Sequence, residues 1–138
     1  MMEKITVLLV DDEKDFLSTM AKRLGKRGLN PLRAETGEAA IDLLKHQPVD
    51  VVVLDVKMPG MDGIATLREI KKIDPLIEVI MLTGHASVEA AIQGMELGAF
   101  DYLMKPTEID ELCYKLEDAY RKKNLQEQKI RQMERQWK

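Results

Sequence analysis

The chain has 138 residues, which is enough for one domain with a single core and too few for two. Hydrophobic residues make up 45% and charged residues 33%, a balance that excludes a disordered chain, a collagen-like repeat and a membrane protein. The net charge of -3 is the sum of two parts of opposite sign, because residues 1–120 carry 14 Lys and Arg against 22 Asp and Glu, whereas residues 121–138 carry 7 against 2.

Short apolar runs alternate along the chain with segments of helical periodicity. The runs predict five strands, at residues 5–10, 31–34, 49–56, 76–82 and 100–104. The third run is almost continuous valine, which is typical of a parallel strand covered by helices on both faces. Hydrophobic residues three and four positions apart predict helices over residues 16–24, 40–44, 64–70 and 88–95, and a fifth that begins at Thr107.

This alternation predicts an α/β fold. Short connections between strands and helices imply right-handed crossovers and an open, doubly wound parallel sheet. Five strands fit the flavodoxin-like order 2-1-3-4-5 with five helices, the last of them extended, and ligands then bind beyond the carboxyl ends of the strands. Four methionines at apolar positions are expected to fill the core: Met20, Met81, Met95 and Met104.

Polar side chains stand where the predicted strands end. Asp11 and Asp12 follow the first strand, Asp55 closes the third, and Thr83 and Lys105 follow the fourth and fifth. Taken singly, the aspartates are also typical of a strand end or helix cap, the lysine of a surface charge, and the threonine of a cap. Because the carboxyl ends of parallel strands meet at one edge, we expect all five side chains to converge, and the convergence indicates a site.

The chemistry of this set indicates phosphoryl transfer. Neighbouring carboxylates repel one another and require a cation, and a set of oxygen ligands selects a hard ion such as Mg²⁺, or Mn²⁺ in its place. Asp11 and Asp12 are the expected metal ligands, and Asp55 is the expected nucleophile that forms an aspartyl phosphate. Lys105 supplies positive charge and Thr83 a hydroxyl donor for the phosphoryl oxygens.

Four segments resemble the receiver domain of two-component response regulators. They are residues 10–13 (VDDE), 54–63 (LDVKMPGMDG), 82–85 (LTGH) and 98–106 (GAFDYLMKP), in the order and spacing of that family. The resemblance covers about residues 4–120. One position is less typical, since Gly84 stands where such receivers more often have alanine.

The resemblance implies roles for these residues. Asp55 accepts a phosphoryl group from the phosphohistidine of a sensor histidine kinase or from a phosphotransfer protein. Mg²⁺ or Mn²⁺ is held by Asp12, Asp55 and the main-chain carbonyl of Lys57, while Asp11 reaches the metal through water. The side chains of Lys57 and His85 set the lifetime of the aspartyl phosphate.

The resemblance also implies a conformational switch. Thr83 moves onto the phosphate and Tyr102 rotates into the space that it leaves, which changes the surface of the fourth helix, fifth strand and fifth helix. That surface controls a downstream output protein or a C-terminal output domain, with transcription as one possible output. The Lys105–Pro106 peptide bond is cis in this family and aims Lys105 into the site. Tyr102 is open to another interpretation, a half-buried aromatic on an edge strand.

The basic segment 121–138 extends the last helix. Two series of positions spaced seven residues apart, starting at Ile109 and at Leu112, are mostly apolar, as are the two core positions of a coiled-coil heptad. Lys123 and Gln126 interrupt these series. A solvated extension or linker and a short coiled coil that makes a homodimer both fit this pattern. Its charges are interspersed and no DNA-binding fold accompanies them, so we expect no direct nucleic-acid binding by the receiver itself, although a tail that dimerises or binds nucleic acid is an alternative function.

Two further expectations concern location and activity. We expect a receiver domain over residues 1–120 and a helical extension over 121–138. The lone Cys113 and an N-terminal apolar run too short for a signal peptide predict a cytoplasmic protein without membrane contact. The competing enzyme class is a Mg²⁺-dependent phosphatase with an aspartyl intermediate. Such enzymes carry a second acid two residues after the nucleophile, where this chain has Lys57, so we expect no enzyme beyond assistance to its own phosphorylation and dephosphorylation.

Overall fold

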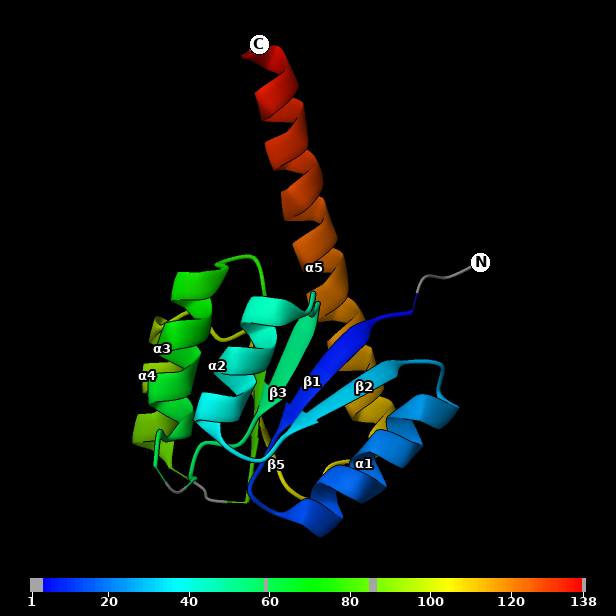
Figure 1. Ribbon diagram of the computed structural model, residues 1–138, viewed down its shortest axis with the longest axis vertical. Helices are drawn as coiled ribbons and strands as arrows, with labels where there is room; N and C mark the ends of the chain where they lie inside the picture. Colours follow the sequence, from blue (N-terminus) through cyan, green and yellow to red (C-terminus); the bar gives the residue numbers. More distant parts are fainter. Residues whose placement is uncertain (1–3, 59, 85–86, 138) are drawn as a thin grey trace.

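Five parallel strands lie between two layers of helices in the computed structural model, which describes residues 4–58, 60–84 and 87–137 (Figure 1). The sheet has the order β2-β1-β3-β4-β5, and every neighbouring pair is parallel. This confirms the predicted order. The strands are β1 (Thr6–Val10), β2 (Asn30–Ala34), β3 (Val51–Leu54), β4 (Glu78–Thr83) and β5 (Asp101–Met104).

The helices alternate with the strands and cover both faces of the sheet. They are α1 (Lys14–Lys26), α2 (Gly37–His46), α3 (Gly63–Ile73), α4 (Val88–Glu96) and α5 (Ile109–Gln136). Val51 and Val53 of β3 pack with α1 and α5, whereas Val52 and Leu54 pack with α2 and α3. The nearly continuous valine run therefore serves two cores, because successive side chains of a strand point to opposite faces.

Several predicted boundaries shift by one to three residues. The fourth strand begins at Glu78 rather than at residue 76, because a turn precedes it in which the Leu76 N–H donates to Asp74 Oδ1 at 2.9 Å. Thr83 is consequently the last residue of β4. The third strand ends at Leu54, so Asp55 follows it, and α5 begins at Ile109 rather than at Thr107, with Glu108 as its N-cap.

The helix at residues 88–95 was predicted correctly, but its apolar stripe is not buried. Ile92 is 54% exposed and Met95 is 47% exposed. The helix instead turns Gly94 toward the sheet, where an added Cβ would lie 2.2 Å from Met81 Sδ. The expectation that Met95 and Met104 fill the core is therefore wrong, while Met20 and Met81 are buried as predicted.

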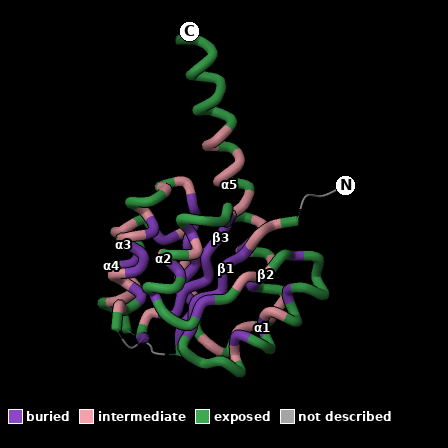
Figure 2. Tube along the Cα trace, in the orientation of Figure 1, coloured by how far each residue is buried: buried purple, intermediate pink, exposed green. Residues whose placement is uncertain are grey.

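The last helix changes its surroundings along its length. Up to Ala119 it packs on the sheet, and beyond residue 127 its side chains are exposed as it projects from the amino-terminal edge (Figure 2). Within the described part of the chain, no helix combines the length and the apolar character needed to cross a bilayer.

Candidate functional site

The carboxyl edge of the sheet places two aspartates directly beyond neighbouring strands. The Asp11 N–H donates to the Ala34 carbonyl at 3.2 Å, and the Asp55 N–H donates to the Val10 carbonyl at 2.9 Å. These bonds continue the ladders of the central strands by one residue. Asp11 and Asp55 are consequently held by rigid backbone, and only 2% and 3% of their surfaces are exposed.

Three carboxylates meet at this edge. One oxygen each from Asp11, Asp12 and Asp55 lies within 4.8 Å of the other two. Asp12 is exposed, whereas Asp55 is buried and its Oδ1 accepts no hydrogen bond from any described residue. A buried carboxylate oxygen without a donor is costly unless another positive group satisfies it. The three residues fit a hard divalent cation, because its preferred ligands are oxygens and its charge offsets their repulsion.

Lys105 is the positive group at this edge. Its Nζ lies 2.6 Å from Asp11 Oδ2 and 3.4 Å from Glu13 Oε1, and it sits 4.0 Å from the centre of the Phe16 ring. Its side chain is 15% exposed. The Lys105–Pro106 peptide bond is cis, as the resemblance implied, and the Lys105 N–H donates to the Thr83 carbonyl at 2.8 Å.

Burial and charge shift the pKa values of this pair. Burial raises the pKa of Asp11, and the hydrogen bonds that it accepts from Lys105 and from the Glu13 N–H offset only part of that effect. Burial lowers the pKa of Lys105, but the hydrogen bond to Asp11 and the charges of Asp11, Asp55 and Glu13 outweigh it and leave the pKa raised. Lys105 therefore stays charged at neutral pH.

Thr83 and Tyr102 lie on neighbouring strands and share one face of the sheet. Thr83 is fully buried at the end of β4 and pairs with Met104 in register. Tyr102 is half-buried and packs against the core beneath α2 and α3. Thr83 points to the same face, because it follows Met81 of that core by two residues. This arrangement is compatible with a coupled movement of Thr83 and Tyr102. It is equally compatible with the other interpretation, in which Tyr102 is an aromatic residue packed on an edge strand.

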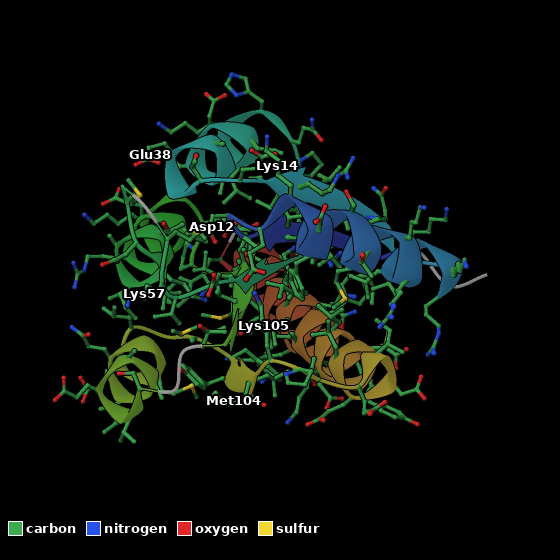
Figure 3. The ribbon with its side chains drawn as sticks, turned by 90° about the horizontal axis from the view of Figure 1, so that it is seen from below. Asp12, Lys14, Glu38, Lys57, Met104 and Lys105 are labelled. Atoms are coloured by element: carbon green, nitrogen blue, oxygen red, sulfur yellow. The ribbon has the colours of Figure 1, made fainter. Side chains whose placement is uncertain are left out.

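The remaining predicted site residues lie at the margin. Lys57 is exposed in the loop between β3 and α3, and Figure 3 shows it on the α3 side of the sheet end, apart from Lys105. His85, predicted to set the phosphate lifetime, lies outside the described residues.

The structure adds three residues that the sequence did not single out. Glu13 and Phe16 contact the ammonium group of Lys105, from the start of α1. Glu38 of α2 accepts a hydrogen bond from the Met61 N–H at 2.9 Å, which ties down the loop between Asp55 and α3. Bonds from its own N–H and from Met61 lower the pKa of Glu38. Of these three residues, only Glu13 could have been identified from the sequence, because it directly follows Asp11 and Asp12.

This arrangement has the parts that phosphoryl transfer requires. It offers a carboxylate oxygen as nucleophile, a group of carboxylates suited to a divalent cation, a fixed ammonium group and a buried hydroxyl. Such groups act by positioning the phosphoryl group and by neutralising the charge on its oxygens.

Comparison with known families agrees with this geometry. The family model described as the response regulator receiver domain matches residues 7–117. The chain is 40% identical over 117 residues to the transcriptional regulatory protein ZraR of Escherichia coli K12, and 40% identical over 120 residues to a putative NtrX-like response regulator of Rickettsia bellii. These matches cover 85% and 86% of the chain but 26% and 25% of the relatives, so the chain spans about a quarter of their length.

Solved structures show the same fold. A response regulator receiver domain from Clostridium thermocellum aligns with a TM-score of 0.83 at 36% identity, covering 88% of this chain and 98% of that one. NtrX from Brucella abortus, crystallised with ADP, aligns with a TM-score of 0.85 at 31% identity, covering 91% of this chain and 29% of that one.

Proposed function

Because this chain belongs to the response regulator receiver domain family, a family of phosphorylation-dependent switches, we propose that Asp55 is its phosphoryl acceptor. The observation that carries the proposal is the buried Oδ1 of Asp55, which has no donor among the described residues although Asp11, Asp12 and Lys105 surround it. A bound cation would supply the positive partner that this oxygen lacks.

In the proposed reaction, a carboxylate oxygen of Asp55 attacks the phosphorus atom of a phosphohistidine. The phosphorus–nitrogen bond breaks, an acyl phosphate forms on Asp55, and the leaving imidazole takes up a proton. Asp12, Asp55 and the main-chain carbonyl of Lys57 would hold Mg²⁺ or Mn²⁺, with Asp11 acting through water. The bound ion would neutralise charge on the carboxylates and on the phosphoryl oxygens.

Lys105 and Thr83 bind the phosphoryl oxygens in this proposal. The ammonium group of Lys105 is now 2.6 Å from Asp11, so it exchanges one oxygen partner for another without leaving the site. A phosphoryl group adds roughly 1.5 to 2 negative charges and three acceptors, which favours closure of both side chains. Tyr102 then moves into the space that Thr83 leaves, while the side chains of Lys57 and His85 tune the lifetime of the phosphate.

The surface that responds comprises α4, β5 and α5. Its exposed apolar residues support a role in binding, because Ile92 and Met95 of α4 and Met104 of β5 each expose more than two fifths of their surface. The partners proposed are a sensor histidine kinase or phosphotransfer protein upstream and an output protein or output domain downstream. The relatives named as transcriptional regulators make transcription the output that we propose.

We propose a division into a receiver over residues 1–120 and a basic helical extension over 121–138. We also propose that the receiver acts on no external substrate. Lys57 occupies the position where an aspartyl phosphatase carries its second acid, and no observation favours that activity. Steady turnover of a phosphate ester by the purified chain would contradict this part of the proposal.

Incubation with acetyl phosphate and Mg²⁺ tests the acceptor. We expect a mass gain of one phosphoryl group that hydroxylamine removes, as it does from an acyl phosphate, and we expect no gain in Asp55→Asn. The matched control is Asp62→Asn in the same loop, because asparagine caps α3 as well as the aspartate does. Labelling of Asp55→Asn equal to that of the unmodified chain would overturn the assignment.

A further inference from the structure

The amino-terminal end of α2 lies against the loop that joins β3 to α3. The Met61 N–H of this loop donates to Glu38 Oε1 at 2.9 Å. A Cβ on Gly60 would lie 3.2 Å from the same carboxylate oxygen, so the loop backbone passes close to Glu38. A Cβ on Gly37 would lie 2.2 Å from Thr66 Oγ1 and 3.0 Å from the Met61 carbonyl oxygen. The first turn of α2 therefore contacts both the loop and the first residues of α3, with no room for a side chain at Gly37.

Glu38 holds this loop at a second point, away from its base. At the base, the Gly63 N–H donates to the Val56 carbonyl at 2.7 Å. Lys57 lies between the two anchored positions, directly after Val56 and four residues before Met61. Figure 3 shows Glu38 and Lys57 on the same side of the sheet end, away from Lys105. The two hydrogen bonds thus restrict the main chain on both sides of Lys57.

The carboxylate of Glu38 has two separable roles. Bonds from its own N–H and from the Met61 N–H lower its pKa, so it accepts as a charged group, and hydrogen bonds to charged acceptors are stronger than neutral ones. Its negative charge also lies in the first turn of α2, where it interacts favourably with the helix dipole. Glutamine at this position would remove the charge but keep an oxygen that accepts from the loop.

We propose that Glu38 is a positioning residue for the divalent cation, because its bond to Met61 keeps the main-chain carbonyl of Lys57 in place as a ligand. The inference rests on the proposed function, which takes Asp12, Asp55 and that carbonyl as ligands. In this role Glu38 contacts neither the ion nor the phosphoryl group. A loop that lacks this restraint must be ordered when the ion binds, and that cost weakens binding.

Titration calorimetry of Mg²⁺ binding to the full chain tests this role. Removal of a group that orients a metal ligand typically weakens binding roughly 10- to 100-fold, and we expect Glu38→Ala to raise the dissociation constant by about tenfold. Glu38→Gln is expected to bind Mg²⁺ nearly as well as the unmodified chain, because it keeps the acceptor. Asp42→Ala is the matched control, since Asp42 is exposed on the same helix, and it is expected to change nothing. Equal weakening in Glu38→Gln and Glu38→Ala would overturn the proposal, because the charge alone would then be responsible.

Hydrogen exchange of the Met61 N–H, measured by NMR without Mg²⁺, provides a second readout. Exchange is expected to be faster in Glu38→Ala and unchanged in Glu38→Gln and Asp42→Ala. A purely structural role would lower the Tm of Glu38→Ala and leave its Mg²⁺ affinity unchanged, which would also overturn the proposal.

Asp12→Asn separates this inference from the proposed function, and it is expected to weaken Mg²⁺ binding. If Asp12→Asn bound Mg²⁺ like the unmodified chain, the proposed cation site would be wrong, and the role of Glu38 with it. If Asp12→Asn weakened binding and Glu38→Ala did not, only the role of Glu38 would be refuted.

Discussion

Replacing Gly63 with alanine is expected to destabilise the fold by displacing the loop that carries Asp55. Gly63 is the first residue of α3, and its N–H donates to the Val56 carbonyl at 2.7 Å. A Cβ at this position would lie 2.3 Å from the Asp55 carbonyl oxygen and 2.5 Å from Val56 Cα. Both contacts are with backbone atoms, which cannot turn aside as a flexible side chain can.

The size of the effect follows from these distances. Ordinary contact begins at 3.4 Å, so the loop and the helix must separate by roughly 1 Å. Overpacking of this kind costs about 1–3 kcal/mol, and stretching the Gly63 hydrogen bond adds about 1 kcal/mol. The better helix propensity of alanine offsets less than about 1 kcal/mol of this loss in stability. We therefore expect a loss of about 2–3 kcal/mol in the free energy of unfolding, a fall in Tm of roughly 10 °C.

Urea unfolding followed by circular dichroism measures this loss, which should appear as a lower midpoint at unchanged m. Gly25→Ala is the matched control, because Gly25 lies in α1 and an added Cβ there meets nothing within 4 Å. The same chemical change should stabilise the protein at that site, by up to about 1 kcal/mol. If Gly63→Ala unfolded at the midpoint of the unmodified chain, the argument from close backbone approach would be refuted.

Three further predictions concern the site and its surroundings. Mg²⁺ should raise the Tm of the protein, EDTA should reverse this rise, and the rise should be smaller in Asp12→Asn. Protonation of Asp11 competes with Mg²⁺, and burial raises the pKa of Asp11. As the pH is lowered, the Mg²⁺-dependent rise in Tm should therefore begin to shrink at a higher pH than it would for a site with an ordinary aspartate. Asp62→Ala should cost about 1 kcal/mol in urea unfolding, because it removes the cap whose carboxylate accepts from the Ala65 N–H at 2.8 Å, and an unchanged midpoint would contradict the cap. Cys113 should react with iodoacetamide more slowly at pH 8 than a free thiol does, because burial raises its pKa and lowers the thiolate fraction, and alkylation at the rate of a free thiol would disprove this.

Local pattern was sufficient for the sheet and for the approximate position of its site. Runs such as residues 49–56 identify strands, and alternation with helices leaves few topologies, so the carboxyl ends of β1, β3, β4 and β5 meet at one edge. The approach of Asp11 to Lys105 across 94 positions of sequence is a consequence of that topology. The strand ends were less predictable, because turns such as that of Asp74 interrupt apolar runs.

The face that a helix buries was not predictable in the same way. Periodicity in residues 88–95 identified a helix and a stripe, but the stripe of α4 is exposed, and the smaller Gly94 faces the sheet. The side chain of Met81 occupies the space where a larger residue would need to lie. That competition between residues on two elements has no signature in the helix itself.

The amino-acid sequence by itself determined the α/β topology and brought Asp11, Asp55 and Lys105 to one edge, because hydrophobic periodicity is local and parallel connections are right-handed. Only the tertiary structure decided that Asp55 Oδ1 is buried without a donor among the described residues and that Phe16 lies against the ammonium group of Lys105. Burial and pairing depend on side chains that meet across long separations in the sequence, and no local pattern contains those distances.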